Sequence, residues 1–239
     1  MYPGAYVGDA PDRPAVIIAG SGWVQTYAEL DAAANRLSRV LHAAGLRPGD
    51  HVALCMENHP RYIEALWGCR YAGLIYTACS SRLTPGELSY IVNDCGAKAV
   101  IVSAAMAPLA TALLPTTPGV ALRLAIGGDV EAHDRYETAL DAQPATPLPD
   151  RVAGTDMLYS SGTTGQPKGV MPSFVPQPLE TSGGSIFGLL TMLFGFEPGD
   201  VYLTPAPLYH AAPLRFTMAV HVLGGTAVVM EHFSPEDFL

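Results

Sequence analysis

Hydrophobic and polar positions alternate with two different periods along the first half of the chain. Between residues 26 and 45, apolar side chains recur every three or four positions, which predicts an amphipathic helix. Thr26 followed by Glu29 is typical of a capping box at the start of that helix. The same signal returns at Thr84 and Glu87, so a second capped helix is expected there.

Short apolar runs separate the helical segments and predict strands that are buried on both faces. We expect strands at 51–56, 73–79, 97–103 and 121–126, and helices at 26–45, 60–71, 84–96 and 104–114. Asn58 or His59 is expected near the N-cap of the second helix. Strands that alternate with helices are typical of right-handed crossovers, so the predicted fold class is α/β, with mainly parallel sheets flanked by helices.

A proline-rich stretch divides this pattern into two parts. Residues 143–150 hold three prolines and few large apolar side chains, which predicts a linker. We expect a first α/β lobe at 1–142 and the start of a second at 151–239. The second half predicts strands at 156–160, 200–210 and 224–233, and helices at 185–196 and 214–224. Ser234 begins a further helix close to the last residue, which favours a truncated, N-terminal part of a longer protein.

The composition narrows the class of function. The net charge is −9 and basic residues form no cluster, so non-specific nucleic-acid binding, which needs basic side chains on phosphate, is not expected. Four cysteines lack C-x-x-C spacing and predict buried, reduced thiols. The histidines form no helical pair at i, i+4, so no metal site is expected.

Neither end of the chain predicts a membrane segment. The N-terminal residues lack the basic and apolar regions of a signal peptide. The longest apolar stretch, 186–196, contains two glycines and is too short to span a bilayer. We therefore expect a soluble, cytoplasmic protein.

The stretch YSSGTTGQPKG, residues 159–169, concentrates the groups that a polyphosphate needs. Glycines let the backbone approach a ligand closely, hydroxyls donate to phosphate oxygens, and one lysine offsets the negative charge. The stretch follows a predicted strand, where α/β sheets place ligands. The alternative is an ordinary Gly/Ser/Thr loop that binds no ligand, and this order of residues is much less expected there.

Two common nucleotide motifs are excluded by the spacing. In a Walker A loop the sixth residue, counting the first glycine as one, must also be glycine, and lysine must follow it directly. The sixth residue counted from Gly162 is Pro167, and from Gly165 it is Val170. No G-x-G-x-x-G follows a predicted strand, so a Rossmann dinucleotide site lacks support as well.

SSGTTGQPKGV closely resembles the phosphate-binding signature of the adenylate-forming (AMP-binding) superfamily, which includes acyl-CoA synthetases, luciferases and peptide-synthetase adenylation domains. The resemblance extends over nearly the whole chain, and PAPLYHAAPL and GGTAVVMEHFSPEDFL are similar to blocks of fatty acyl-CoA ligases. It implies the N-terminal domain of an acyl-CoA synthetase-like fold. It also implies a fatty acid–CoA ligase that uses ATP, Mg²⁺ and coenzyme A to activate a medium- or long-chain carboxylic acid as acyl-AMP and transfer it to the thiol.

The resemblance implies a role for each matching residue. The loop that holds the β- and γ-phosphates would consist of Ser160, Ser161, Gly162, Thr163, Thr164, Gly165 and Lys168. Tyr209 and His210 would lie beside the carboxylate and the acyl pocket. A hydrogen-bonded structural histidine is the plain alternative for His210.

The family's later motifs have no counterpart in this sequence. These are the stretch that holds Mg²⁺ and adenine, the ribose-binding aspartate and the small C-terminal domain with the catalytic lysine. The histidine that often follows the loop is also missing, since MPSFVPQPLETSGG stands there. We therefore expect no catalytic residue in this chain and little or no ligase activity from it alone.

Two other functions stay open. The first is another adenylate-forming enzyme, either an aryl-CoA ligase or an amino-acid adenylation domain. The second is a non-catalytic fragment that binds nucleotide or a partner, with self-association through uncovered apolar surface. Peripheral membrane contact would follow from a long-chain acid substrate, although no basic amphipathic helix or lipidation signal supports it.

Overall fold

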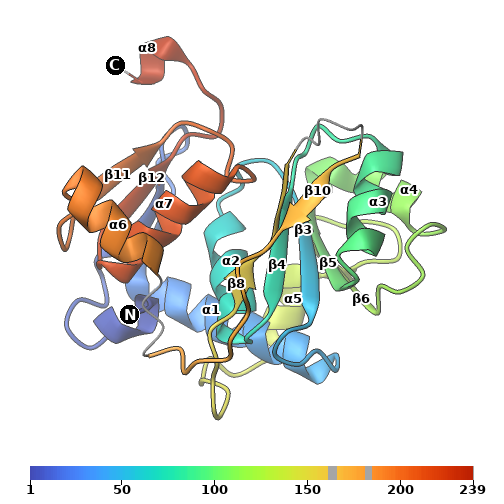
Figure 1. Ribbon diagram of the computed structural model, residues 1–239, viewed down its shortest axis with the longest axis horizontal. Helices are drawn as coiled ribbons and strands as arrows, with labels where there is room; N and C mark the ends of the chain where they lie inside the picture. Colours follow the sequence, from blue (N-terminus) through green and yellow to red (C-terminus); the bar gives the residue numbers. More distant parts are fainter. Residues whose placement is uncertain (161–165, 181–184, 239) are drawn as a thin grey trace.

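The chain builds two β-sheets, with helices between them and on their outer faces (Figure 1). The computed structural model describes residues 1–160, 166–180 and 185–238, with backbone alone at 185–187, 189 and 190. The six-stranded sheet has the order β7-β6-β5-β3-β4-β8, and all its neighbouring strands are parallel. The four-stranded sheet has the order β11-β12-β1-β2, and only β1 and β2 are antiparallel. A separate hairpin pairs β9 with β10.

The elements have the following bounds. The strands are β1 (Pro14–Ile18), β2 (Val24–Thr26), β3 (His51–Cys55), β4 (Ile75–Cys79), β5 (Ala97–Ser103), β6 (Leu122–Ile126), β7 (Asp134–Arg135), β8 (Thr155–Asp156), β9 (Leu158–Ser160), β10 (Lys168–Val170), β11 (Val201–Thr204) and β12 (Thr226–Val229). The helices are η1 (Pro3–Tyr6), α1 (Tyr27–Ala43), α2 (Tyr62–Tyr71), α3 (Pro85–Asp94), η2 (Ala104–Met106), α4 (Ala107–Leu113), α5 (Tyr136–Asp141), α6 (Ser185–Phe194), α7 (Ala211–Val222) and α8 (Pro235–Phe238). The α/β class expected from the pattern is confirmed.

Alternate side chains of the six-stranded sheet enter two different cores. Val52 and Leu54 of β3 pack with α1 and α2, whereas Ala53 and Cys55 pack with α3 and α4. Successive side chains of a strand point to opposite faces, so a strand covered on both faces must be apolar throughout. This explains the continuous apolar runs that predicted these strands.

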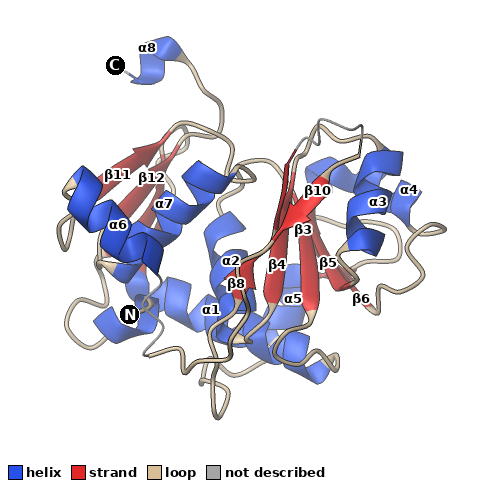
Figure 2. Cartoon of the chain, viewed as in Figure 1, coloured by secondary structure: helices blue, strands red, loops and turns tan. Residues whose placement is uncertain are grey.

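Helices α1 and α2 lie between the two sheets, while α6 and α7 lie in front of the four-stranded sheet (Figure 2).

Both capping boxes expected from the sequence are confirmed, at Thr26 with Glu29 and at Thr84 with Glu87. All four cysteines are free and buried, as predicted. Among the described residues, no helix combines the length and hydropathy that a membrane span requires.

The two sheets do not follow the expected order of two consecutive lobes. β1 and β2, which lie within 1–142, join β11 and β12 of the second half, and β8 pairs with β4 of the first half. The single strand expected at 156–160 is two strands in different sheets. Parallel pairing joins segments that are distant in sequence, so hydrophobic periodicity finds a strand without identifying its partner. Residues 143–150 contain neither helix nor strand.

Candidate functional site

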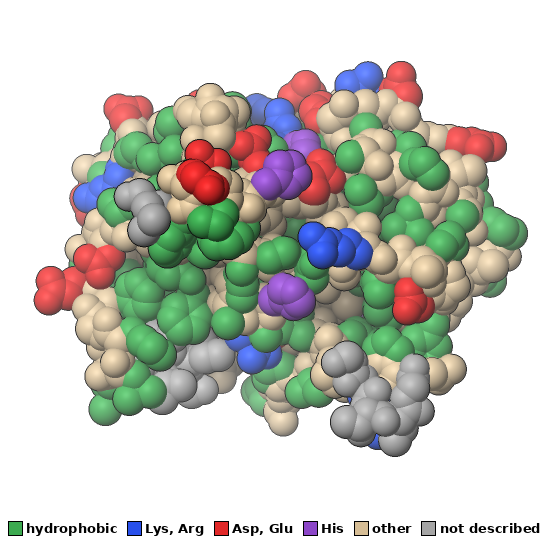
Figure 3. Space-filling view, turned by 90° about the horizontal axis from the view of Figure 1, so that it is seen from above, with side chains coloured by type: hydrophobic (Ala, Val, Ile, Leu, Met, Phe, Trp, Pro, Cys, Tyr) green, Lys and Arg blue, Asp and Glu red, His purple; other side chains and the backbone are tan. Residues whose placement is uncertain are grey.

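The carboxyl-terminal ends of the parallel strands form one edge of the molecule, at the top of Figure 1. Ligands of α/β proteins bind at this edge, because the loops that leave the strands converge there. Figure 3 views the molecule from this side. Histidine and basic side chains lie near the middle of this face, among hydrophobic and acidic ones.

The hairpin of β9 and β10 carries the two ends of the predicted phosphate loop. Ser160 and Lys168 are directly opposite each other in its antiparallel register, and both are exposed. Ser161, Gly162, Thr163, Thr164 and Gly165, which complete the predicted loop, lie outside the described residues. The structure therefore places the first and last members of the predicted set side by side.

Two tyrosine hydroxyls tie this hairpin to helix α3. The hydroxyl of Tyr159 donates to Oδ2 of Asp94 at 2.5 Å, and the hydroxyl of Tyr90 donates to the carbonyl of Pro167 at 3.3 Å. Burial raises the pKa of Tyr159, and the hydrogen bond to Asp94 adds to that rise. At Gly169 a Cβ would lie 2.1 Å from the terminal methyl of Met157, so a larger residue there would require the Met157 side chain to move. The base of the hairpin is thus held from both strands.

A cavity of about 500 Å³ opens at the same edge between the two sheets. It is lined by residues that follow β3, β4, β11 and β12, namely Glu57, Asn58, Ser81, Arg82, Pro205, Pro207, Tyr209, Glu231, His232 and Phe233. The carboxylate of Glu57 accepts a hydrogen bond from the hydroxyl of Ser103 at 2.6 Å. A cavity with apolar walls and a few charged groups suits a small ligand with both a polar and an apolar part.

Tyr209 lies at this cavity and His210 follows it in the chain, on the turn that precedes α7. Tyr209 lines the cavity and is half-buried. The ring of His210 is 4.4 Å from that of Tyr209, measured between centroids, and its side chain is exposed. The N–H of His210 donates to the carbonyl of Pro207 at 3.1 Å, which closes the turn.

The sequence pattern missed Asn58 as a residue of this site. Of the two residues expected near the N-cap of α2, Asn58 takes no part in capping, whereas Nδ1 of His59 accepts a hydrogen bond from the N–H of the N-cap residue Arg61 at 3.1 Å. Asn58 instead bonds across the cavity wall to the backbone of Ala206, Leu208 and Met230. A polar residue three positions beyond a buried strand was the available signal, since the loops that leave such strands lie at the ligand edge.

No group of three or more His, Cys, Asp or Glu side chains in the described part of the chain is arranged to hold a metal ion. Two carboxylates at this edge already accept hydrogen bonds from protein groups, Asp94 from Tyr159 and Glu57 from Ser103. A divalent cation at this edge would therefore depend on oxygens brought by a ligand, such as phosphate.

The sequence matches a family model over almost its whole length. The model described as "AMP-binding enzyme" matches residues 5–239. A feruloyl-CoA synthase from an Amycolatopsis species is 34% identical over 228 residues, which cover 92% of this chain and 42% of the relative. A long-chain-fatty-acid–CoA ligase from Mycobacterium tuberculosis is 32% identical over 213 residues, which cover 87% of this chain and 40% of the relative.

Solved structures lead to the same family. The N-terminal domain of FACL13 from Mycobacterium tuberculosis is similar with a TM-score of 0.81 and 25% identity, over all of this chain and 59% of that one. A fatty acyl CoA synthetase from the same organism has a TM-score of 0.79 and 25% identity, over 97% of this chain and 44% of that one. The chain spans about two fifths of the length of the curated relatives named above. On this evidence the chain belongs to the AMP-binding enzyme family.

Proposed function

We propose that this chain supplies the phosphate-binding hairpin and part of the acid-binding face of an ATP-dependent acid–CoA ligase. In that reaction a carboxylate oxygen attacks the α-phosphorus of ATP, pyrophosphate leaves, and an acyl-adenylate forms. The thiol of coenzyme A then attacks the acyl carbonyl and AMP leaves. The observation that carries the proposal is the hairpin that sets Ser160 opposite Lys168 at the ligand edge of a parallel sheet.

The hairpin residues are suited to the pyrophosphate end of ATP. The exposed ammonium group of Lys168 offers a point charge, and the hydroxyls of Ser160, Ser161, Thr163 and Thr164 offer neutral donors. Gly162 and Gly165 add no side chain between the backbone and the phosphates. Mg²⁺ would enter with ATP and neutralise part of the phosphate charge. The tie between Tyr159 and Asp94 would keep the first strand of the hairpin in place while the ligand binds.

We propose Tyr209 and His210 as the residues that border the acid. Tyr209 lines the cavity, and the exposed ring of His210 lies 4.4 Å from that of Tyr209 between centroids. A carboxylate in this position would lie between the two sheets, where Arg82 and His232 add positive or neutral donors. We propose no catalytic residue within this chain.

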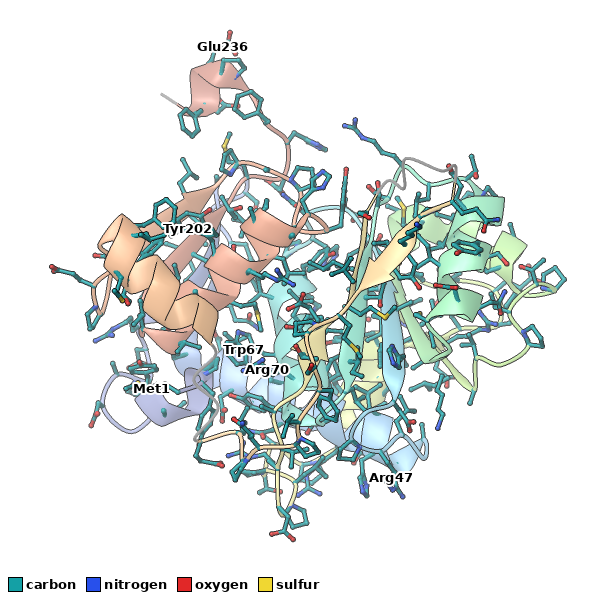
Figure 4. The ribbon with its side chains drawn as sticks, viewed as in Figure 1. Met1, Arg47, Trp67, Arg70, Tyr202 and Glu236 are labelled. Carbon is teal, nitrogen blue, oxygen red and sulfur yellow. The ribbon has the colours of Figure 1, made fainter. Side chains whose placement is uncertain are left out.

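The proposed acid is a medium- or long-chain fatty acid. Helix α6 has the nearly apolar sequence SIFGLLTMLF, and aromatic rings of Phe194, Phe196, Tyr202 and Phe216 pack together beside it at centroid distances of 5.3–6.0 Å. Figure 4 labels Tyr202 on β11, within this group. An aromatic acid is the second candidate, because the 34% identical relative carries the name feruloyl-CoA synthase.

Calorimetric titration distinguishes these candidates without requiring turnover. The purified chain is titrated with Mg²⁺–ATP and then with acyl-sulfamoyl adenosines, which mimic the acyl-adenylate, carrying octanoyl, palmitoyl, feruloyl, benzoyl or phenylalanyl groups. We expect ATP to bind and the octanoyl or palmitoyl compound to bind most tightly. Tighter binding of the feruloyl or benzoyl compound would indicate an aryl-CoA ligase, and of the phenylalanyl compound an amino-acid adenylation domain. If neither ATP nor any of the analogues binds, the result would contradict the proposal and favour a non-catalytic role.

A pyrophosphate-release assay tests the expected inactivity of the chain alone. The in-line attack at the α-phosphorus needs precisely placed positive charge to stabilise it. The described residues offer ligand-binding groups, but we propose none of them for this stabilisation. We expect no release above background with ATP, Mg²⁺ and the fatty-acid panel. Sustained turnover would contradict this expectation.

A further inference from the structure

We propose that Asn58 is a positioning residue, which fixes the turn carrying Tyr209 and His210 against the end of β3. The inference rests on the proposed function, in which this turn borders the acid. It is carried by three hydrogen bonds that a single buried amide makes to two distant loops. We call these three bonds the Asn58 bridge.

The Asn58 bridge uses the whole side-chain amide. Its Nδ2 donates to the carbonyl of Met230 at 2.8 Å and to the carbonyl of Ala206 at 3.2 Å. Its Oδ1 accepts from the N–H of Leu208 at 2.8 Å. Two donors and one acceptor on a short side chain are available from asparagine, whereas aspartate lacks the donors and leucine lacks both.

The bridge joins the two sheets at the ligand edge. Asn58 follows β3 of the six-stranded sheet, whereas Ala206 and Leu208 follow β11, and Met230 follows β12, of the four-stranded sheet. The N–H of Met230 also donates to the carbonyl of Thr204 at 3.1 Å, so the ends of β11 and β12 are tied to each other. The bridge thereby sets where the second sheet's loops stand relative to the first.

The position of Tyr209 follows from that of its neighbour. Leu208 is fully buried, and its N–H is the group held by Asn58. Tyr209 comes next in the chain, and the turn from Pro207 to His210 closes with one backbone hydrogen bond. Displacement of Leu208 would therefore move both predicted acid-binding side chains together. The same cavity is lined by Asn58 and Tyr209, which places the bridge within its wall.

Burial makes the bridge sensitive to small chemical changes. Asn58 is 8% exposed, so groups left without a partner after a substitution would not be rehydrated readily. An aspartate here would set carboxylate oxygens against the carbonyls of Ala206 and Met230 while keeping the acceptor for Leu208. A leucine would remove all three bonds at similar volume.

The test compares Asn58→Leu and Asn58→Asp with a matched control, Asn35→Leu. Asn35 is also buried, at 1% exposure, but its amide bonds to Asp31 on helix α1. Amide hydrogen exchange measured by NMR reports the bond at Leu208 directly. Calorimetry gives the affinities for the tightest-binding acyl-sulfamoyl adenosine and for Mg²⁺–ATP.

We expect both Asn58 variants to bind the acyl-sulfamoyl adenosine about tenfold more weakly, the change that follows from loss of one well-formed buried hydrogen bond. Their ATP affinity should change by less than about twofold, because the phosphate hairpin is tied to α3 and not to this turn. Exchange of the Leu208 N–H should be faster in Asn58→Leu than in wild type. It should be slower in Asn58→Asp than in Asn58→Leu, because the aspartate keeps the acceptor. Asn35→Leu should lower stability without changing the ratio of the two affinities.

Equal analogue affinity in folded wild type and Asn58 variants would overturn the inference, as would unchanged exchange at Leu208 in Asn58→Leu. If Asn58→Leu does not fold, the test rests on Asn58→Asp and on the ratio of its affinity for the acyl-sulfamoyl adenosine to its affinity for Mg²⁺–ATP. Failure of the wild-type chain to bind either ligand would refute the proposed function instead. In that case Leu208 exchange still decides whether the bridge holds the turn.

Discussion

The helices between the sheets and the ligand edge differ in how their polar groups are held. Between the sheets, the side chains of His221 and Glu64 are fully buried and hydrogen-bonded to other protein groups. At the edge, Lys168 and His210 are exposed, and the hairpin is tied down by a few surface hydrogen bonds. The difference indicates that the side chains expected to contribute most to stability are not the exposed ones proposed to bind the ligand.

His221 is the centre of the buried network. Its Nε2 contacts the carbonyl of Ala15 at 2.9 Å, and Nε1 of Trp67 donates to its Nδ1 at 3.3 Å. These partners require a neutral imidazole with its proton on Nε2. The ring also lies edge-on to Tyr27 and Trp67. Figure 4 shows Trp67 and Arg70 on α2, between the sheets, where this network joins β1, α2 and α7.

The largest expected effect is the loss of Trp67. Trp67→Ala removes a fully buried ring and the donor to His221, and should lower the free energy of unfolding by about 3–5 kcal/mol. Urea unfolding monitored by circular dichroism measures the change. Trp23→Ala is the control, because Trp23 is only partly buried and should cost much less. Equal losses for the two tryptophans would contradict the comparison.

The second prediction concerns the stability of the fold at acidic pH. Burial lowers the pKa of His221 to about 4 from its ordinary value of 6.5. The unfolded chain therefore binds this proton at higher pH than the folded chain, so the contribution to stability is complete above about pH 6.5 and is lost as the pH falls to about 4. The loss over that window is roughly 3 kcal/mol.

Urea unfolding at several pH values between 7 and 4 tests this prediction in wild type and His221→Gln. The variant lacks the titrating group and should lose less stability than wild type over the same window. The buried carboxyl groups of Asp31 and Glu64, whose pKa values are raised by burial, titrate in both proteins and cancel in the difference. Parallel pH profiles of the two proteins would contradict the assigned role of His221.

A third, smaller effect is expected where α1 crosses α2. A Cβ on Gly68 would lie 2.5 Å from Cδ2 of Leu37, so Gly68→Ala should cost about 1–3 kcal/mol through overpacking. Gly188→Ala is the matched control on α6, because no atom of the part of the chain that the structure describes lies within 4 Å of its added Cβ. The control should gain up to about 1 kcal/mol in helix propensity. Thermal unfolding of the two variants would sharpen the contrast between the helices.

The smallest expected change in stability lies at the hairpin. Tyr159→Phe removes the exposed bond to Asp94 and should cost about 0.5–1 kcal/mol. Its ATP affinity should fall by about threefold, because the first strand of the hairpin loses its tie to α3. Tyr90→Phe, which removes the longer bond to Pro167, should have a weaker effect on ATP affinity. The reverse order would show that the second strand is the more important anchor.

Local signals in the sequence predicted most elements, because caps and periodicity are local properties. The two capped helices and the strands β3, β5 and β6 lie where the pattern placed them. β1 and β2 were not expected. β1 begins at a proline and both strands are short, and their stability comes from pairing with β12 and each other.

The site could be predicted only where its residues are contiguous. Ser160 and Lys168 were found together because one sequence signature contains both, and the hairpin confirms that they are neighbours. Asn58 was given the wrong role because its three partners lie 148 to 172 positions further along the chain. A side chain that connects distant loops leaves no periodic or local pattern, so only the folded arrangement identifies it.

The central claim is that the hairpin of β9 and β10, which carries Lys168, binds the phosphates of ATP. The chain has two lysines, which gives a matched pair of variants. Lys98 lies at the amino-terminal end of β5, away from the ligand edge, and forms an ion pair with Asp50 at 2.7 Å. Because both lysines are exposed, Lys168→Ala and Lys98→Ala should each leave the free energy of unfolding within about 1 kcal/mol of wild type.

Calorimetric titration of the three proteins with Mg²⁺–ATP is the most direct measurement. We predict that Lys168→Ala weakens ATP binding by about tenfold, as expected for loss of one charge-assisted contact to phosphate, and that Lys98→Ala binds like wild type. Unchanged ATP affinity in a folded Lys168→Ala protein would contradict the assignment of this hairpin as the phosphate-binding element.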